Sequence, residues 1–570
     1  MERYEFSSDR RGFPRILSGY PVDIEIENPP SDFPPSISGE IGNISSEGAS
    51  LILNSSLPVS SLVTLRLDLP PDSSPIETKA QVVWSYFLEK NKKFNCGVRF
   101  LDLGEKHREV LNKLIGEGIE NNKSVPERRR SDRRVKTKEL KERLWKAEMV
   151  LKKVKKTMDR RVVMTGLGVI APNGIGKDAF WKAIKSGKSG IRKITRFDPS
   201  EFPSQIAGEI NDFDPVDFIS PKKARQMDRF AQLAVSAAKM AIKDSQLRIN
   251  KNNVHRIGVT MSSAVGGTDF AEQQHDIFRE AGIKKVSPFL AISLFPGSCS
   301  SQVSIEMGIK GYGNTVSTAC AAGSDAIGCA FHSIRHGLAD AMITGGADAP
   351  IAPLTFGAFC AMGALSKRND EPEKASRPFN KDRDGFVMSE GAAVIILEEL
   401  EYALRRGAHI YAEVVGYGST YDAYHMTAFN PDGKEPARAI RLALEEAGLG
   451  PRDVDYINAH GTSTPINDRV ETLAIKQVFG DHAYRIPVSS TKSMTGHSLA
   501  GAGAIELVAC ALTLENQFIH PTINYENLDP ECDLDYVPNK GRKLGISVIV
   551  SNSFGFGGKN ACIVIRKYKG

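Results

Sequence analysis

A basic, strongly polar segment from about residue 126 to residue 161 constrains the fold most, because the residue pattern changes across it. It begins PERRRSDRRVK, a run without the apolar spacing that could bury one face. Further along, apolar side chains recur at alternating steps of four and three, at Leu140, Leu144, Ala147, Leu151, Val154 and Met158. This spacing predicts an amphipathic helix within a linker over residues 121–159. A solvated connector, a short coiled coil and a contact with an anionic surface are all compatible with it.

The residue patterns before and after the linker predict different folds. Before it, apolar and polar residues alternate in VDIEI and LVTLRLDL, and further strands are predicted at 81–84 and 96–100. Short strands separated by turns predict a small β-barrel over residues 5–120. After it, apolar strands alternate with helical segments such as RFAQLAVSAAKMAIKD, which is an α/β pattern. Because 570 residues exceed what one hydrophobic core usually organises, we predict a multidomain protein whose second part begins near residue 160.

Composition narrows the functional classes. Hydrophobic residues at 41% and charged residues at 25% are typical of folded soluble proteins, and no apolar run is long enough to span a bilayer. The opening MERYEFSSDR lacks an apolar signal region, and the 8 cysteines form no CxxC pair. A net charge of +6 is modest for this length. We therefore expect a cytoplasmic protein with no metal site, no nucleic-acid partner and no stable membrane insertion.

Cys320 differs from the other cysteines in its position, between a strand-like segment and a small-residue helix, in NTVSTACAAGSDAIG. Unpaired amide donors and the positive end of a helix dipole favour the thiolate there, which is the nucleophilic form. The small neighbouring residues would let a bulky thioester approach. Taken alone, a cysteine in this setting is more often a small core residue.

Two loop segments add histidines to this cysteine. INAHGTSTP contains His460, and SSTKSMTGH contains Lys492 and His497. Each histidine alone could be structural. Both lie among Gly, Ser and Thr residues, in loops of the kind where catalytic side chains are often placed. A cysteine with two distant histidines is compatible with acyl-transfer chemistry.

From about Arg161 to Tyr568 the chain resembles the β-ketoacyl-acyl-carrier-protein synthase II type of condensing enzyme, a branch of the thiolase superfamily. The matching segments occur in family order: VVMTGLGVIAP, RFDPSEFPSQIAGEI, TACAAGSDAIG, RPFNKDRDGFVMSEGAA, EVVGYGSTYDAYHMTA, INAHGTSTPINDRVET, SSTKSMTGH and SNSFGFGGKNA. The resemblance implies a thiolase-like, five-layered α/β/α/β/α domain. It would consist of two similar halves, 160–410 and 411–570, and would usually form a homodimer.

The resemblance also implies roles for the motif residues. Cys320 would take the acyl chain, and the backbone N–H groups of Cys320 and Phe556 would form an oxyanion hole. His460 and His497 would act on the malonyl donor and hold the enolate oxygen in their neutral form. The two-histidine pattern favours this decarboxylative branch over thiolases and over Cys-His-Asn condensing enzymes.

The remaining site residues are implied in the same way. Lys492 and Glu506 would support the two histidines. Thr462 and Thr464 would contact the phosphopantetheine arm of the acyl carrier protein, and Val265 and Phe359 would line the acyl pocket. The mechanism requires no metal or organic redox cofactor.

Acyl carrier proteins are acidic in this family, so the resemblance implies a basic docking patch. Its usual positions carry Lys222, Arg225, Lys284 and Lys285. Relatives commonly read RALSTRND where this chain reads GALSKRND, so Gly363 replaces a basic residue of the patch. Further departures near the reactive centre, in TAFNPDG, HSLAGAG and MSEGAA, leave the acyl chain preference open.

The N-terminal part carries a second resemblance. The segment DRRGFPRI contains an RxxxR arrangement, formed by Arg11 and Arg15 and preceded by Arg10. The segment IGNISSEGASL contains an NxSxxG arrangement, formed by Asn43, Ser45 and Gly48. With VTLRLDLP, VVW and CGVRFLDL after them, they resemble a PilZ domain, the bacterial receptor for cyclic di-GMP. Arginine forks pair with phosphates and engage guanine, and Asn and Ser side chains could read a base edge. A degenerate PilZ fold without a ligand is the alternative.

The expected function is therefore that of a β-ketoacyl-acyl-carrier-protein synthase in fatty acid elongation, with cyclic di-GMP as a regulatory ligand. It would condense malonyl-carrier protein, with loss of carbon dioxide, onto a cysteine-bound acyl chain. Two alternatives stay open. One is a specialised lipid or polyketide ketosynthase with an inert PilZ domain, and the other is a non-catalytic, nucleotide-responsive scaffold.

Overall fold

The computed structural model describes residues 21–26, 36–44, 48–55, 57, 61–67, 76–88, 93–102 and 160–570. The chain divides into two compact units, Met1–Lys146 and Ala147–Gly570. This division falls inside the predicted linker, and the predicted linker helix lies outside the described residues.

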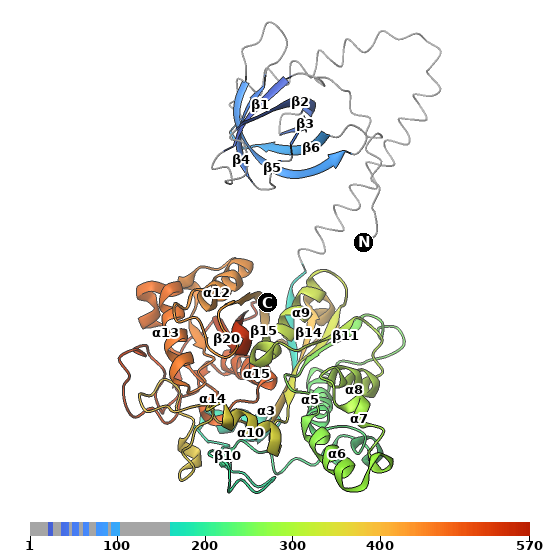
Figure 1. Ribbon diagram of the computed structural model, residues 1–570, viewed down its shortest axis with the longest axis vertical. Coiled ribbons are helices and arrows are strands. Elements are labelled where there is room, and N and C mark those ends of the chain that lie inside the picture. Colours follow the sequence, from blue (N-terminus) through green and yellow to red (C-terminus); the bar gives the residue numbers. More distant parts are fainter. Residues whose placement is uncertain are drawn as a thin grey trace. The chain divides into compact units, whose positions relative to one another are not determined.

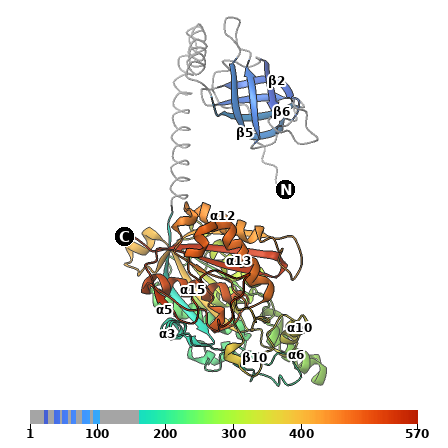
Figure 2. The same cartoon turned by 90° about the vertical axis from the view of Figure 1, so that its left-hand side faces the viewer.

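Six antiparallel strands of the first unit pair in a closed barrel, in the order β1-β2-β3-β6-β5-β4 (Figures 1 and 2). Their bounds are β1 (Pro21–Ile26), β2 (Ser36–Ile44), β3 (Gly48–Leu53), β4 (Leu62–Leu67), β5 (Ile76–Leu88) and β6 (Lys93–Phe100). The alternation predicted in VDIEI is confirmed, because Val22, Ile24 and Ile26 are buried whereas Asp23 and Glu25 are exposed. The inward side chains of the described strands form a core of their own.

An 11-stranded sheet organises the second unit, in the order β12-β11-β13-β14-β7-β15-β21-β20-β16-β17 with β8 beside β7. Its strands are β7 (Val162–Ala171), β8 (Gly174–Ile175), β11 (Ile257–Ser262), β12 (Gly313–Val316), β13 (Ala341–Asp348), β14 (Gly391–Glu399), β15 (Ala412–Tyr421), β16 (Tyr456–Asn458), β17 (Val488–Ser489), β20 (Val548–Gly555) and β21 (Lys559–Arg566). Two further pairs of short strands are β9 (Arg192–Lys193) with β10 (Ile206–Ala207), and β18 (Phe518–Ile519) with β19 (Arg542–Lys543).

Strands β12, β11, β13, β14 and β7 form one half of this sheet, and strands β15, β21, β20, β16 and β17 form the other. Helices lie on the outer face of each half and also between the two halves (Figure 1). The helices of residues 160–570 are α3 (Lys177–Lys185), α4 (Pro221–Ala224), α5 (Arg229–Ser245), α6 (Thr268–Ala281), α7 (Leu290–Ser293), α8 (Ser298–Met307), α9 (Ala322–Arg335), α10 (Pro353–Ala361), α11 (Leu400–Arg405), α12 (Lys434–Ala447), α13 (Pro465–Phe479), α14 (Lys492–Thr495) and α15 (Ala500–Asn516). Helix α5 packs on β7, β13 and β14, and α12 packs on β15, β20 and β21, whereas α9 and α15 contact strands of both halves. The elements therefore stack as helix, sheet, helix, sheet, helix.

Matching glycines let the outer helices approach the two halves of the sheet. A Cβ on Gly168 of β7 would lie 2.0 Å from the carbonyl oxygen of Ala237 in α5. A Cβ on Gly418 of β15 would likewise lie 2.0 Å from the carbonyl oxygen of Ala439 in α12. Any larger residue would push the helix off its strand. Each half of the sheet therefore has a glycine at the place where its outer helix approaches most closely.

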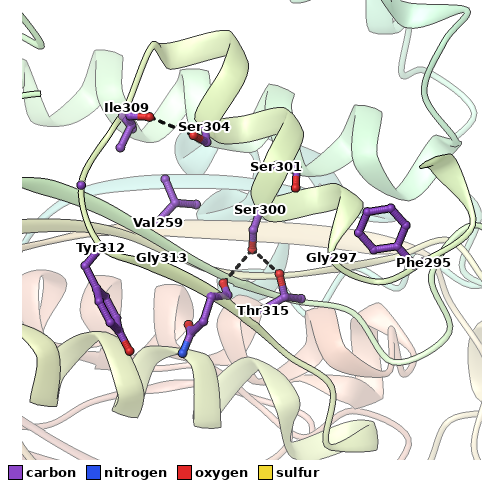
Figure 3. Close-up of a pocket in the computed structure, with 12 residues that line it drawn as sticks. Val259, Phe295, Gly297, Ser300, Ser301, Ser304, Ile309, Tyr312, Gly313 and Thr315 are labelled. Atoms are coloured by element: carbon purple, nitrogen blue, oxygen red, sulfur yellow. Dashed lines mark hydrogen bonds between the residues drawn. The ribbon is translucent and has the colours of Figure 1, made fainter. Parts of the chain in front are cut away.

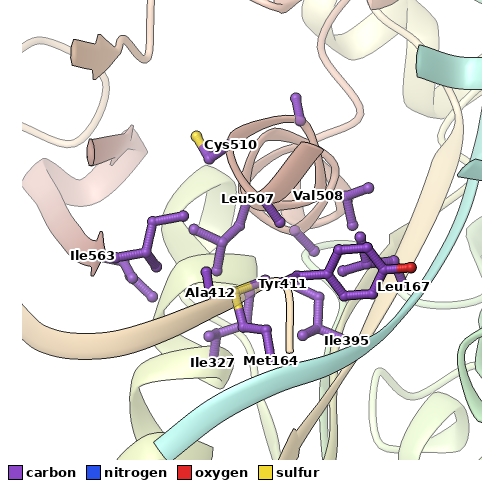
Figure 4. Packing of buried hydrophobic residues seen from close by; sticks show 14 of the residues in the cluster. Met164, Leu167, Ile327, Ile395, Tyr411, Ala412, Leu507, Val508, Cys510 and Ile563 are labelled. Carbon is purple, nitrogen blue, oxygen red and sulfur yellow. The ribbon is translucent and has the colours of Figure 1, made fainter. Parts of the chain in front are cut away.

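Helix α15 lies in the middle layer and is buried on nearly every side. Leu507 and Val508 of this helix pack against Met164 and Leu167 of β7 and Ile395 of β14 (Figure 4). The same buried helix carries a carboxylate, Glu506, which is 1% exposed. A charge in such a core needs a partner, and its partner belongs to the candidate site. Among the described residues, none of the helices combines the length and the apolar character that crossing a membrane requires.

Candidate active site

Cys320 lies in a 3₁₀ turn, η5 (Ala319–Ala321), directly before α9, which confirms the predicted helix after it. The preceding Ala319 has a φ of 51°, a left-handed conformation that costs energy for a residue with a Cβ. Gly555 lies so close that a Cβ on it would be 3.0 Å from the amide nitrogen of Cys320. The next N–H along the chain, that of Phe556, lies near enough to the Cys320 sulfur to lower the pKa of the thiol. The backbone donors of Cys320 and Phe556 therefore meet at the thiol.

Burial raises the pKa of the Cys320 thiol to about 11, although the charge of Lys492 and the N–H of Phe556 lower it. The helix start alone predicted a shift toward the thiolate, so the structure corrects this expectation. Removing a thiolate from water outweighs the nearby donors. That burial comes from strands and loops far along the chain, which the local motif does not reveal.

A buried lysine fixes the proton of His460. Nζ of Lys492 donates to Nδ1 of His460 at 3.1 Å and to the carbonyl oxygen of His460 at 2.8 Å. Because Nδ1 accepts this bond, the neutral ring carries its proton on Nε2. Glu506 of α15 forms an ion pair with Lys492, and all three side chains are at most 2% exposed. Glu506 thus balances the buried ammonium.

A second carboxylate shapes the loop after β16 that carries His460. Glu471 of α13 accepts hydrogen bonds from the N–H groups of His460 and Gly461, each at 2.8 Å. Thr462 and Thr464 follow, and their hydroxyl oxygens lie 2.9 Å apart. The Thr464 side chain also caps α13. The loop is therefore tied at both ends to the helix that follows it.

His497 lies beside His460. The two rings are 5.3 Å apart between centroids, at an interplanar angle of 84°. The backbone of His497 is held by Val387 and Ser389, through hydrogen bonds of 2.8 and 3.0 Å. Its Nδ1 is buried and has no hydrogen-bond partner within the described residues. This nitrogen is therefore available to a ligand.

Both histidines are neutral at neutral pH. Burial holds the pKa of His460 and that of His497 well below 6.5, and the positive charge of Lys492 lowers both further. A neutral imidazole offers one N–H donor and one acceptor nitrogen. The pair can therefore donate hydrogen bonds to an anionic oxygen without first becoming charged.

A row of aromatic rings connects the cysteine side of the site with the histidines. The ring of Phe359, from α10, stacks on Phe556 at 6.4 Å between centroids and meets Phe386 edge-on at 6.0 Å. Phe386 in turn lies 5.3 Å from the ring of His497. The structure thus places Phe359 with the candidate site residues.

Asp348 ties Val265 to the same region. It lies at the end of β13 and accepts hydrogen bonds from the N–H of Val265 at 3.3 Å and from that of Ala500, the first residue of α15, at 2.8 Å. Burial raises the pKa of Asp348 to about 6, although these donors oppose the shift. Asp348 and Glu471 could not be predicted as site residues, because only contacts between positions distant in the sequence give them a role.

The four residues predicted to dock a carrier are all exposed. Lys222 and Arg225 lie in and directly after α4, and Lys284 and Lys285 lie in a 3₁₀ turn after α6. Within residues 160–570, no carboxylate lies at ion-pair distance from any of them. Gly363 has a φ of 71°, and a Cβ there would meet open space. Its conformation suits glycine better than the basic residue common at this place.

Most of the predicted cyclic di-GMP residues lie outside the described residues: Arg10, Arg11, Arg15 and Ser45. Asn43 lies in β2, where its backbone pairs with Ser50 of β3, and Gly48 begins β3. The N-terminal site therefore stays a prediction.

A cavity of about 280 Å³ lies elsewhere, beside the edge strand β12 (Figure 3). Hydroxyl groups of α8 line it, and Ser300 bonds there with Thr315 and with the carbonyl oxygen of Asn314. Phe295 and Tyr312 also border it. None of its lining residues belongs to the candidate active site, so the cavity is a separate feature.

Family comparisons agree with this geometry. The model of the β-ketoacyl synthase N-terminal domain matches residues 159–403, and that of its C-terminal domain matches residues 411–526. The PilZ domain model matches residues 9–117. A 3-oxoacyl-[acyl-carrier-protein] synthase 2 of Synechocystis sp. is 52% identical over 410 residues, which are 72% of this chain and 99% of the relative. The enzyme of the same name from Coxiella burnetii is 49% identical over 408 residues, again 72% of this chain and 99% of the relative.

Solved structures show the same thiolase-like ketosynthase fold. The ishigamide ketosynthase/chain length factor superposes with a TM-score of 0.68 at 39% identity, covering 72% of this chain and all of that one. A type II polyketide ketosynthase, solved with its acyl-carrier protein and bound to a hexaketide, gives a TM-score of 0.66 at 42% identity with the same coverage. The chain belongs to the β-ketoacyl synthase family and carries a PilZ domain at its N-terminus.

Proposed function

We propose that this chain is a 3-oxoacyl-acyl-carrier-protein synthase of fatty acid elongation, working through Cys320, His460 and His497. One observation carries the proposal. Two backbone N–H groups meet at the thiol of Cys320, and two neutral, buried histidines lie side by side in the same domain. The proposed boundaries are 5–120 for the PilZ domain, 121–159 for the linker, and 160–410 and 411–570 for the synthase halves.

The first step loads the acyl chain. The sulfur of Cys320 attacks the thioester carbonyl of an acyl-carrier protein, and a tetrahedral intermediate forms. Its oxyanion accepts hydrogen bonds from the N–H groups of Cys320 and Phe556, which already converge on the sulfur. Because burial keeps the thiol protonated at rest, its proton leaves as the bond to carbon forms and is passed to the departing phosphopantetheine thiolate. The product is an acyl thioester on Cys320.

The second step forms the carbon–carbon bond. The malonyl thioester loses carbon dioxide, and the electron pair of the broken bond becomes an enolate. Nε2–H of His460 donates a hydrogen bond to the enolate oxygen, with His497 as the second donor. The enolate carbon then attacks the acyl-Cys320 carbonyl, and the Cys320 sulfur departs. Thr462 and Thr464, which follow His460, are proposed to contact the phosphopantetheine arm, and Val265 and Phe359 to line the acyl pocket.

Acyl carrier protein is the proposed partner. The polyketide ketosynthase of similar structure was solved in complex with such a carrier. In this chain, the exposed and unpaired basic residues of α4 and of the turn after α6 offer a docking surface for an acidic protein. The open Gly363 would weaken this surface at one place. Polyketide chains are the competing substrate class, because one solved relative described above is a type II polyketide ketosynthase bound to a hexaketide.

We also propose that the synthase forms a homodimer along the edge strand β12. This strand ends the sheet, and three exposed apolar side chains lie in or near α8 and β12: Phe295 at 46%, Ile305 at 64% and Tyr312 at 40% exposure. Two copies paired across β12 would cover an unpaired edge and these side chains. Light scattering of the purified chain measures the mass directly, and a monomer at assay concentration would refute the dimer.

A condensation assay tests the catalytic proposal. The full-length chain is incubated with malonyl-carrier protein and with acyl-carrier proteins of several chain lengths, including a polyketide intermediate. A product two carbons longer, released with carbon dioxide, supports a condensing enzyme, and the preferred acyl chain identifies the pathway class. Failure with every acyl chain would favour a scaffold without catalysis.

The pH dependence of decarboxylation checks the state of the histidines. The active form of the pair is neutral, and its pKa values lie well below 6.5, so lowering the pH from 8 to 6 leaves both rings neutral. We therefore expect the rate of carbon dioxide release from malonyl-carrier protein, on acyl-enzyme prepared beforehand, to stay nearly constant over this range. Burial raises the pKa values of Glu471 and Glu506 to about 7, so these two carboxyl groups can titrate in the same range. An inflection near pH 6.5 that persists in both Glu471→Gln and Glu506→Gln would contradict the assignment of neutral histidines.

Cyclic di-GMP is the proposed ligand of the PilZ domain. We expect Arg11→Ala with Arg15→Ala to weaken its binding to the full-length chain at least about tenfold, because charge-assisted bonds to phosphate are lost. Calorimetry measures the affinity. Arg128→Ala with Arg129→Ala removes the same charge from the linker and should leave the affinity unchanged. Equal weakening by both double variants would show only non-specific attraction, and adding the ligand to the condensation assay tests the proposed regulation.

A further inference from the structure

Asp325 and Lys559 form a buried ion pair that the mechanism above does not use. Nζ of Lys559 lies 3.3 Å from Oδ2 of Asp325, and the two side chains are 8% and 4% exposed. Asp325 lies in the first turn of α9, close after Cys320 in the chain, and Lys559 begins β21 shortly after Phe556. The pair therefore connects the two segments whose N–H groups meet at the thiol.

Asp325 also holds the residues before the nucleophile. The hydroxyl of Thr318, two residues before Cys320, donates to Oδ2 of Asp325 at 2.5 Å. The hydroxyl of Tyr417, from β15, donates to Oδ1 at 2.5 Å. Both oxygens of the carboxylate are thus engaged. The carboxylate therefore connects Thr318, which precedes the strained Ala319–Cys320 bend, with the first turn of α9.

Lys559 anchors the other segment. Its ammonium also donates to the hydroxyl of Ser419 and lies 4.7 Å above the ring of Tyr421, both in β15. The turn just before it contains Gly557 and Gly558, with φ values of 78° and 70°. Two glycines in succession give this turn conformational freedom. Two backbone hydrogen bonds hold this turn, from the N–H of Gly557 to the carbonyl oxygen of Met426 and from the N–H of Asp422 to the carbonyl oxygen of Gly558, each at 2.7 Å. The side chain of Lys559 adds an anchor where the turn ends, three residues after Phe556.

We propose that Asp325 and Lys559 are positioning residues that fix the N–H of Cys320 and the N–H of Phe556 relative to each other. This inference rests on the proposed function, because the spacing matters only if these donors hold an oxyanion. The pair would speed reactions that pass through a tetrahedral intermediate at Cys320. It would have little effect on a reaction of the same thiol that forms no oxyanion.

Two reactions of Cys320 separate these effects. The first is acylation by acyl-carrier protein in a single turnover, followed by intact-protein mass. The second is alkylation by iodoacetamide at the same pH, which displaces iodide and forms no oxyanion. The main variant is Asp325→Asn with Lys559→Met, which removes one negative and one positive charge and leaves the net charge unchanged. We expect acylation to slow about 10- to 100-fold and alkylation to change by less than about threefold.

Matched variants complete the experiment. Lys559→Met alone leaves a buried carboxylate without its cation and can fail to fold, which is why the double variant is the main one. Lys559→Arg keeps the charge and should recover most of the acylation rate. Lys177→Met with Asp244→Asn removes an ion pair between α3 and α5 and should leave acylation unchanged.

The two rates distinguish a failure of the positioning role from a failure of the proposed function. An acylation rate of the Asp325→Asn, Lys559→Met variant equal to that of the wild type would overturn the positioning role. A parallel fall of acylation and alkylation would also overturn it, since it would indicate a general disturbance around Cys320. A wild type that alkylates but is never acylated would refute the proposed function itself.

Discussion

Cys320→Ala is expected to lower the condensation rate about 10⁴-fold or more, because the variant has no atom that can carry the acyl chain. Alanine is the same size as its neighbours in the turn, and the position is almost fully buried, so the fold should persist. The rate is measured as β-ketoacyl product formed from acyl- and malonyl-carrier protein. Intact-protein mass should show no acylated species.

Cys562→Ala provides the control for this prediction. Cys562 is equally a buried free cysteine, but it lies in β21 within an apolar core. Its replacement should leave the rate near that of the wild type. Substantial product from Cys320→Ala, with the acyl chain found on another residue, would remove Cys320 from the mechanism.

Lys492→Met is expected to lower both the stability and the activity of the synthase. The substitution leaves Glu506 in the middle layer without its cation, and one oxygen of that carboxylate already has no partner among the described residues. Losing one member of a buried pair costs about 3–5 kcal/mol of unfolding free energy. Nδ1 of His460 also loses its donor, so the ring is no longer held in the Nε2–H tautomer, and we expect decarboxylation to fall about 10²-fold.

Lys492→Met with Glu506→Leu separates the two effects. Removing both charges should restore most of the stability, as measured by urea-induced unfolding, because no uncompensated charge stays buried. Decarboxylation should stay slow, since His460 still lacks its donor. If the double variant recovers the rate together with the stability, then Lys492 acts only through the fold and not through His460.

The sequence predicted the elements best where the pattern is local. Alternation in VDIEI predicted strand β1, and the small-residue run after Cys320 predicted the start of α9. These features depend on neighbours along the chain, which a sequence displays directly. Family motifs added the order of the domains and the family itself, which the family comparisons confirm.

Long-range features could not be predicted in this way. The pKa of the Cys320 thiol is raised, whereas its position before a helix predicted a lowered pKa, because burial by distant segments has the larger effect. The bond from Lys492 to Nδ1 of His460 depends on how two loops meet. The ion pair of Asp325 with Lys559 joins residues that are more than two hundred positions apart in the sequence. Such contacts are set by the packing of the whole domain.

Cys320 is proposed to carry an acyl chain onto which a decarboxylated malonyl unit is condensed. The most direct test begins with acyl-enzyme purified after reaction with acyl-carrier protein, with the acyl group located on the Cys320 peptide by mass spectrometry. Malonyl-carrier protein is then added in a single turnover. We predict loss of the acyl mass from the enzyme, one carbon dioxide per acyl group and a β-ketoacyl-carrier product two carbons longer. Hydrolysis of the acyl group without product, or an acyl group that stays on the enzyme, would show that Cys320 is not the acyl carrier of a condensation.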